Sequence, residues 1–246
     1  FGLANLVVSL YVIREECYAD GVSLPELQEM LEAGFEGYEA ERRHFLQDYP
    51  KYGQGDADVD ALVSGVTERF AEFCEGHKME PDGSPFIPGA FVWVKHEQLG
   101  SQSGATPDGR PGGAPFADGA GPAQGRETAG PTAAILSTTA WDHSAYIGGI
   151  AMNMKFPKKL LSTDAERDKF RHLVMTYLSR GGFEVQVNVL DADILKKARA
   201  NPEQYADLVV RIGGYTDYFT SLSEGMQDEL IARTEYWGEA RHGIRR

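Results

Sequence analysis

The second half of the chain alternates between strand-like and helix-like segments, and this order restricts the fold more than any other feature. Apolar runs typical of buried strands occupy residues 149–155, 183–189 and 208–212. The Thr163-Asp-Ala-Glu166 capping box predicts a helix after the first run, and a second helix is predicted over 191–200. Strands separated by helices are typical of a parallel sheet. The sequence therefore predicts an α/β fold. The first of these helices is predicted to bury Phe170, Leu173, Val174, Tyr177 and Leu178.

The first third of the chain is predicted to be helical. The apolar opening over 1–13 indicates a buried helix, and Ser23-Leu-Pro-Glu26 is a capping box that opens a helix through Leu31. Further helices are predicted over 38–46 and 59–75. The last of these is expected to present one apolar face, made of Val59, Leu62, Val63, Val66, Phe70, Phe73 and Cys74. Two more strands are predicted over 90–95 and 133–138, and a short helix after Asn201.

Glycine and proline dominate the segment between these two halves. Residues 100–131 contain nine glycines and five prolines. Composition alone favours a flexible linker here.

A pair of glycines ends the last predicted strand. Gly213 and Gly214 follow the run over 208–212, and Ser221-Leu-Ser-Glu224 is an N-cap signal for a helix ending near Arg233. Gly214 is therefore predicted to lie on a strand-to-helix turn. Most Gly-Gly pairs have no function beyond such a turn.

The residues around this glycine pair carry a family resemblance. The string Arg211-Ile-Gly-Gly-Tyr215, with Gln227-Asp-Glu229 and Ile231-Ala-Arg-Thr234 after it, resembles the C-terminal signature of glycyl radical enzymes, the pyruvate formate-lyase superfamily. In that family the glycine before the tyrosine carries a stable backbone radical, and here that glycine is Gly214. A Cα radical is stabilised when the carbon flattens, and glycine has no Cβ to crowd that geometry.

The Gly/Pro-rich segment supplies a second motif. Thr106-Pro-Asp-Gly-Arg110, Ala114-Pro-Phe-Ala-Asp118, Gln124-Gly-Arg-Glu-Thr128 and Gly130-Pro-Thr132 look like the long loop before the radical domain in the dehydratase and decarboxylase branches. The resemblance extends from about Asn5 to Tyr236. It implies that the loop is ordered, with Asp108, Arg110, Asp118 and Arg126 in loop hydrogen bonds and ion pairs.

The resemblance implies a fold and a division of the chain. The family fold is a ten-stranded α/β barrel, and this chain is expected to hold its later part with peripheral helices. The expected regions are a helical region leading into the barrel (1–99), the ordered Gly/Pro-rich loop (100–132) and the C-terminal glycyl radical domain (133–246). The chain begins with Phe1 inside an apparent helix, and we expect it to be a fragment or one part of a split polypeptide.

The resemblance also implies partners. An activating enzyme that uses S-adenosylmethionine and an iron–sulfur cluster removes hydrogen from the glycine, and no cofactor is bound by the chain itself. The stored radical then oxidises a cysteine to a thiyl, which takes hydrogen from a small organic substrate. That cysteine is expected outside this sequence, because Cys17 and Cys74 both fall on predicted helices and are interpreted as structural thiols. We therefore expect the chain alone to be inactive, and the full enzyme to be a homodimer.

Further candidate residues surround the glycine. Arg211, Gly213 and Tyr215 are candidates for support of the radical loop. Gln186 and Asn188 alternate with apolar residues on one predicted strand, and they either line the active-site interior or are satisfied core amides.

Composition excludes several other classes. The net charge of −13 without a basic stripe argues against nucleic-acid binding, and no segment is long and apolar enough to span a membrane. The six histidines form no metal-ligand pattern, and two cysteines make no disulfide framework. The acidic residues at 36–41 and 56–60 are interpreted as solvated helix faces. A cytoplasmic, reducing and anaerobic setting is expected.

Three functions remain open from the sequence. The first is the radical-bearing part of a lyase or dehydratase. Within it, Phe156-Pro-Lys-Lys and the residues after Gly214 look somewhat like fumarate-adding alkyl- or arylsuccinate synthases. The second is a non-catalytic spare-part module that carries a radical, although such modules are shorter and lack the loop. The third is a structural remnant that carries no radical.

Overall fold

The computed structural model describes residues 1–19, 21–91, 95–211, 216–228 and 230–231. Its α-helices are α1 (Leu3–Cys17), α2 (Leu24–Glu32), α3 (Glu39–Gln47), α4 (Ala57–Glu75), α5 (Lys95–Ser101), α6 (Pro131–Thr138), α7 (Asp164–Ser179) and α8 (Ala192–Ala200). Its strands are β1 (Met152–Pro157), β2 (Val185–Leu190), β3 (Val209–Arg211) and β4 (Thr216–Tyr218). Short 3-10 helices are η1 (His143–Ala145), η2 (Lys158–Leu161), η3 (Pro202–Tyr205) and η4 (Phe219–Ser221).

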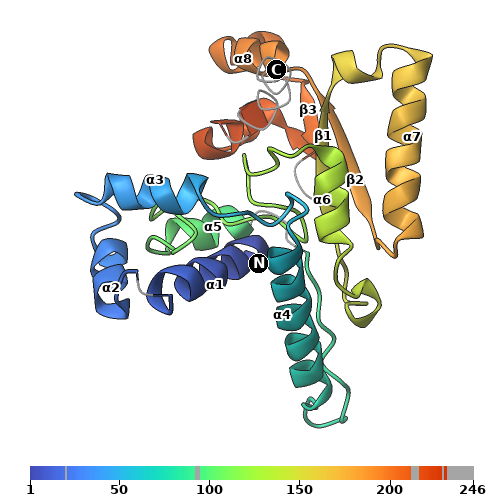
Figure 1. Cartoon of the computed structure of the whole chain (residues 1–246). Helices are drawn as coiled ribbons and strands as arrows, with labels where there is room; N and C mark the ends of the chain where they lie inside the picture. Colours follow the sequence, from blue (N-terminus) through green and yellow to red (C-terminus); the bar gives the residue numbers. More distant parts are fainter. Residues whose placement is uncertain (20, 92–94, 212–215, 229, 232–246) are drawn as a thin grey trace.

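A helical part formed by α1 to α4 occupies one side of the molecule (Figure 1). The capping box of α2 is present, since Ser23 Oγ accepts from the Glu26 backbone and Glu26 returns a bond to the Ser23 N–H. Asp56 is the N-cap of α4 and not part of a solvated face. Apolar residues of α1 and α4 share the largest core cluster.

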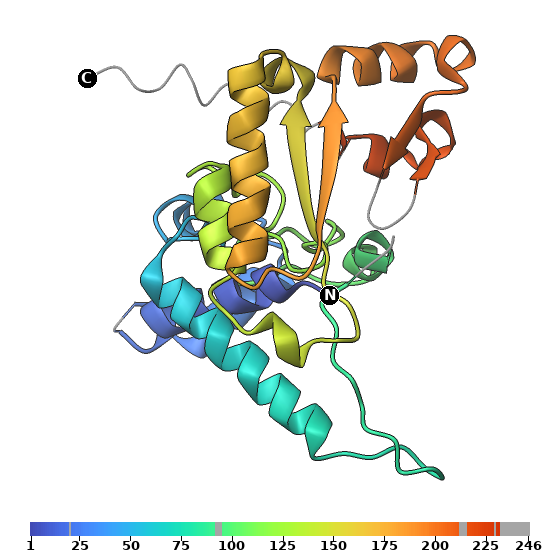
Figure 2. The same ribbon diagram turned by 90° about the vertical axis from the view of Figure 1, so that its right-hand side faces the viewer.

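The helical part buries only some of the apolar residues that the sequence predicted to be buried. Val59, Val63 and Cys74 on α4 are buried, but Phe70 and Phe73 are 50% and 60% exposed. On α1, Leu6 is 48% exposed, so the opening helix is buried on one face only. Figure 2 shows α4 extending away from the rest of the chain, which agrees with the exposure of Phe70 and Phe73 near its far end.

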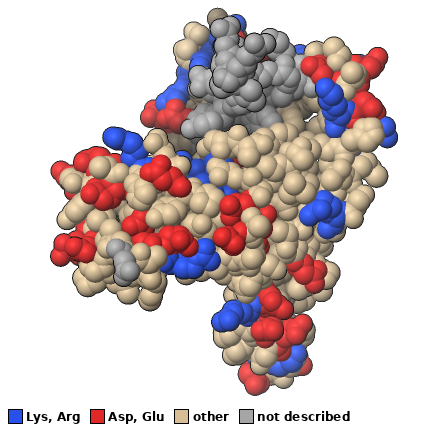
Figure 3. Space-filling model, viewed as in Figure 1, with Lys and Arg blue, Asp and Glu red and all other residues tan. Residues whose placement is uncertain are grey.

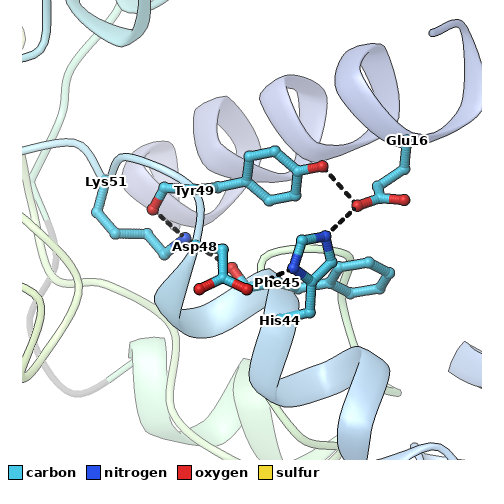
Figure 4. Close-up of polar contacts among 6 residues, drawn as sticks. All are labelled: Glu16, His44, Phe45, Asp48, Tyr49 and Lys51. Carbon is cyan, nitrogen blue, oxygen red and sulfur yellow. Dashed lines mark hydrogen bonds and ion pairs between the residues drawn. The ribbon is translucent and has the colours of Figure 1, made fainter. Parts of the chain in front are cut away.

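An ion-pair network joins α1 to α3 (Figure 4). His44 lies between two carboxylates, with Nε2 2.7 Å from Glu16 Oε1 and Nδ1 2.6 Å from Asp48 Oδ2. Tyr49 donates to the same Glu16 oxygen at 2.5 Å. Because a carboxylate only accepts, both ring nitrogens of His44 donate when the ring is protonated. Hydrogen bonding to Asp48 and Glu16 raises the pKa of His44, against the opposing effect of burial.

This network predicts a pH-dependent contribution to stability. A histidine whose pKa is raised on folding stabilises the fold fully below its unfolded pKa, and that stability is lost as pH rises through the folded pKa. We therefore expect His44→Gln to lower the thermal unfolding midpoint most below about pH 6.5, with a shrinking difference toward about pH 9. His77→Gln is the control, because the His77 ring contacts a backbone carbonyl and no carboxylate. A difference that stays constant across this range would contradict the assignment.

The predicted α/β unit is present for the first two of the three predicted strands, whereas in the described part of the chain the third strand, β3, pairs antiparallel with β4 in a separate sheet. β1 and β2 pair in parallel, with Met152 opposite Val185 and Asn153 opposite Gln186, and α7 connects them. The capping box of α7 is formed by Thr163 and Glu166. Figures 1 and 2 show α6 and α7 beside the strand pair, where Met152, Met154, Phe156 and Tyr177 form a second core cluster with residues of α6. Within α7, Tyr177 is fully buried while Leu178 is 45% exposed.

One predicted strand is wrong, and another lies partly outside the described residues. The segment over 133–138 belongs to α6, which begins with Pro131 in its first turn. Of the strand predicted over 90–95, the described residues show a single parallel bridge between Ala90 and Ile150, and Lys95 opens α5.

The Gly/Pro-rich segment between α5 and α6 is tied to the rest of the chain. Asn5 donates from Nδ2 to Asp108 Oδ2 at 2.7 Å and accepts from the Ala117 N–H at 2.7 Å. Tyr52 donates to the Ala120 carbonyl at 3.0 Å. Gly119 has a φ of +56°, and a Cβ there would lie 2.2 Å from the Ala151 carbonyl oxygen, so only glycine fits. The flexible linker favoured by composition alone is therefore not observed.

Acidic side chains are concentrated on the helical part of the molecule. Acidic side chains gather over α1, α2 and α3 on the face shown in Figure 3. Within the described ranges, every helix is too short or too polar to cross a lipid bilayer.

Candidate functional site

The predicted radical glycine is bracketed by two paired strands. β3 and β4 are antiparallel, with Val210 opposite Asp217 and Arg211 opposite Thr216. Gly213, Gly214 and Tyr215 lie outside the described residues, as does the side chain of Arg211. The turn predicted at Gly214 falls on residues that the structure does not describe; among the described residues, β4 and η4 stand between β3 and the next helix. That helix begins at Glu224, and Ser223 is its N-cap through a 3.2 Å bond from the Met226 N–H.

These strands belong to a core of their own. Val210 and Phe219 are buried with Leu195 and Ala198 of α8, and with Met226 and Leu230 of the final helix. An ion pair between Arg199 and Asp228 and a 3.0 Å bond from Gln227 Nε2 to the Phe219 carbonyl join the same elements. The local fold is thus fixed by residues 191–231, on both sides of the glycine pair.

A hydrogen bond connects this unit to the helix that precedes the Gly/Pro-rich segment. Ser223 donates from Oγ to Glu97 Oε1 of α5 at 2.7 Å. Beside it lies a cleft whose walls come from α1, the Gly/Pro-rich segment and the final helix, lined in part by Asn5, Arg110, Arg126, Gly225 and Asp228.

The predicted loop contacts are found for Asp108, Arg110 and Asp118. Arg110 is buried and donates to the carbonyls of Pro111, Ala114 and Gly104, and its guanidinium lies 4.1 Å from the Phe116 ring centroid. Burial lowers the pKa of Arg110, and neighbouring Asp108 opposes that shift. Asp118 accepts from Asn153 Nδ2 at 3.1 Å. For Arg126, the backbone carbonyl accepts from Gln54.

The second predicted set, Gln186 and Asn188, lies on one buried face of β2. The opposite face of the strand carries Val185 and Val187, which pack on the core beneath α7. Gln186 donates to Glu184 Oε1 at 2.8 Å, so its amide is satisfied. The Nδ2 of Asn188 is buried and makes no hydrogen bond within the described part of the chain.

Sequence reasoning missed the matching residues on β1. Asn153 and Lys155 lie opposite Gln186 and Asn188 in the parallel register, and both are buried. The signal was available, because polar and apolar residues alternate strictly over 152–156. Asn153 and Lys155 line a small hollow with Asp118, Pro122, Gln124 and Glu127 of the Gly/Pro-rich segment.

Neither cysteine lies on these elements. Cys17 ends α1, and burial beside Glu16 raises the pKa of its thiol. Cys74 is buried on α4. Over the residues that the structure describes, no three histidine, cysteine or acidic side chains form a group that could hold a metal ion.

Comparison with known families covers both halves of the chain. Residues 1–100 match a family model described as pyruvate formate lyase-like. Residues 116–220 match a family model described as glycine radical, and this range includes β3, β4 and the glycine pair.

Similar proteins of known sequence or structure cover nearly the whole chain. A probable dehydratase, YbiW of Escherichia coli K12, is 34% identical over 244 residues, which is 96% of this chain and 30% of the relative. Trans-4-hydroxy-L-proline dehydratase of Clostridioides difficile is 33% identical over 241 residues, 95% of this chain and 30% of that protein. A solved structure concerning 1,2-propanediol dehydration in Roseburia inulinivorans has a TM-score of 0.90 at 34% identity, over 95% of this chain and 30% of its own.

The chain thus spans about 30% of the length of these relatives. The two family models, the sequence likeness over nearly the whole of this chain and the TM-score of 0.90 agree with one another. The chain belongs to the glycyl radical enzymes of the pyruvate formate lyase-like type.

Proposed function

We propose that this chain is the radical-bearing segment of a glycyl radical enzyme and stores an unpaired electron on the Cα of Gly214. The match of residues 116–220 to the glycine-radical family carries the proposal, because it spans the glycine pair between β3 and β4. The unit around the pair has its own core, which supports a fixed position for the radical.

The proposed chemistry moves one hydrogen atom at a time. A separate activating enzyme, which uses S-adenosylmethionine and an iron–sulfur cluster, takes a hydrogen atom from Gly214 Cα. The radical then takes the hydrogen of a cysteine S–H, which restores the glycine and leaves a thiyl. The thiyl takes a hydrogen atom from a substrate C–H bond and returns it to the product radical. The protein supplies placement and exclusion of solvent for these steps.

We place the thiyl cysteine outside this chain, on a further segment of the enzyme. Cys17 and Cys74 both lie on helices of the α1–α4 part, apart from the core that holds β3 and β4. The partners are then this segment, the activating enzyme and a small organic substrate, with a homodimer as the assembled state. The chain alone is expected to turn over no substrate.

The cysteine assignment gives a test of its own. In the activated, complete enzyme, Cys17→Ala and Cys74→Ala should each keep kcat within about two-fold, because a buried free cysteine acts as a small apolar residue. Alanine at the thiyl position of the other segment should abolish turnover and leave the glycyl radical signal intact. A variant of Cys17 or Cys74 that lost turnover while keeping that signal would move the thiyl into this chain.

We also propose supporting roles near the radical. Arg211, Gly213 and Tyr215 hold the glycine in place, and Gln186 and Asn188 line the active-site interior from β2. The reaction belongs to the lyase and dehydratase branches, and the dehydratase likeness over nearly the whole chain supports this choice over fumarate addition. A non-catalytic spare part is disfavoured by the match of residues 1–100, which such a module does not need.

Electron paramagnetic resonance tests the proposal. After anaerobic activation of the complete enzyme, a doublet from the remaining Gly214 Cα–H is expected, and it should collapse to a singlet in protein made with Cα-deuterated glycine. A spectrum that deuterated glycine leaves unchanged would refute a glycyl radical.

A further inference from the structure

Asn153 presents a buried acceptor that no part of the described chain uses. Its Nδ2 donates to Asp118 Oδ2 at 3.1 Å, and a carboxylate accepts but never donates, so the orientation of the amide is fixed. The Oδ1 atom is therefore the one left over. It is buried, has no hydrogen-bond partner among the described residues and lines the small hollow beneath the Gly/Pro-rich segment. The whole residue is 8% exposed.

Asn188 presents the complementary group on the neighbouring strand. Its Nδ2 is a buried donor without a partner in the described ranges, and the residue is 4% exposed. Asn153 pairs with Gln186 and Lys155 pairs with Asn188, so the two asparagines occupy diagonal positions on one face of the strand pair. Diagonal neighbours on one face lie about 7–8 Å apart, so a group bound between them can be reached by both side chains only when they point toward each other. The burial of both atoms is unfavourable unless something else bonds them.

We propose that Asn153 and Asn188 form a subsite that binds one hydroxyl group of a small organic substrate. The hydroxyl donates its hydrogen to Asn153 Oδ1, and its oxygen accepts from Asn188 Nδ2. This deepens the proposed function and depends on it, because it requires that the β1–β2 face lines the active site.

The pairing of one donor with one acceptor selects a hydroxyl over other common groups. An ammonium group has no lone pair to accept from Asn188, and an ionised carboxylate has no hydrogen to give to Asn153. The hollow that Asn153 lines is small and has room for a group about the size of one water molecule, which fits a single hydroxyl.

Ligand binding to the complete, unactivated enzyme tests the subsite. The probes are trans-4-hydroxy-L-proline, 1,2-propanediol and L-proline, which is the first probe without its hydroxyl. Dissociation constants are measured by saturation-transfer NMR. Asn188→Leu should weaken binding of the two hydroxylated probes by about ten-fold, since one hydrogen bond to ligand is lost, and should leave L-proline unaffected. The exposed Asn201→Leu is the matched control and should change none of the three.

Stability of the same variant gives a second, independent readout. Because Asn188 Nδ2 has no partner among the described residues, its replacement by leucine should not lower the thermal unfolding midpoint of the ligand-free enzyme. A lowered midpoint would mean that the amide is a structural partner, which overturns the subsite.

Three binding results would also overturn the subsite. They are a loss of affinity for L-proline as large as that for the hydroxylated probes, an unchanged affinity of Asn188→Leu for the hydroxylated probes, and failure of both hydroxylated probes to bind the parent enzyme. A crystal structure in which an ordered water bridges the two asparagines while a hydroxylated probe is bound elsewhere would overturn it as well. Binding is measured before activation, so the two proposals can fail separately. An enzyme that gives no glycyl signal after activation but shows Asn188-dependent binding before it would refute the proposed glycyl radical and leave the subsite standing.

Discussion

Air admitted to the activated enzyme should cut the chain at Gly214 and release a fragment that contains residues 214–246. Oxygen adds to a carbon radical, and the peroxyl group that forms at a backbone Cα leads to cleavage of the chain there. The site of cleavage therefore reports where the electron was stored. Mass spectrometry of the two fragments identifies that position directly, and the unactivated enzyme should remain whole.

Gly214→Ala should abolish both the electron paramagnetic resonance doublet and this cleavage. A Cβ crowds the flattened geometry that stabilises the radical and removes one of the two hydrogens that the activating enzyme can take. The neighbouring glycine provides a matched control. Gly213→Ala adds the same methyl group one residue away; because Gly213 is proposed only to hold Gly214 in place, the doublet should weaken without vanishing, and the remaining cut should still fall at Gly214.

Cleavage at the same place in activated Gly214→Ala would contradict the assignment. Loss of the signal in both alanine variants would show instead that the segment between β3 and β4 tolerates no Cβ. A far-ultraviolet circular dichroism spectrum that matches the parent confirms that each variant is folded, so that a lost signal reflects chemistry.

Helix starts were predictable from the sequence because their signals are local. Ser23 with Glu26, and Thr163 with Glu166, form the capping boxes that the sequence predicted, and α2 and α7 begin where expected. Such caps depend on residues three positions apart and need no tertiary contact.

Short apolar segments were not predictable in the same way. Residues 133–138 are apolar without a clear period, and a run of this length fits a buried strand or a buried helix. The structure makes it α6, where Pro131 in the first turn favours a helix. β4 was missed because Thr216–Tyr218 is only three residues long and depends on pairing with β3.

The candidate site was predictable only where the strand pattern exposed it. The alternation at Gln186 and Asn188 correctly indicated one polar and one apolar face of β2. Whether either amide is satisfied depends on partners far along the chain. Asn153 finds Asp118 across 35 residues, and no local pattern reports such a contact. The Gly/Pro-rich segment misled for the same reason, since its order comes from bonds to Asn5 and Tyr52.

Loss of the Arg110 side chain should release the Gly/Pro-rich segment from the rest of the protein. Arg110 is 5% exposed and donates to three backbone carbonyls and to Thr106 Oγ1 at 3.2 Å. In Arg110→Met these carbonyls lose their charged donor while they stay part-buried. Each hydrogen bond to a charged group contributes about 1.5–3 kcal/mol, so the segment should be destabilised by roughly 3 kcal/mol or more even when the effects are not additive.

Limited digestion with thermolysin measures this local opening in the complete enzyme. A loss of about 3 kcal/mol raises the population of the open segment about 100-fold, and cleavage within residues 102–130 should accelerate by that factor when reclosing is fast. Arg110→Lys keeps the charge but loses the planar fork that reaches several acceptors at once, so it should fall between the parent and the methionine variant. Arg43→Met removes an exposed arginine from α3 and should leave the rate unchanged.

The same opening should reach the first helix, because Asp108 in this segment holds Asn5 of α1. Amide hydrogen exchange in Arg110→Met should therefore rise at residues 3–9 together with residues 104–118, while α7 stays protected. A methionine variant that resists thermolysin as well as the parent would show that the segment is held by its contacts with Tyr52 and Gln54 instead.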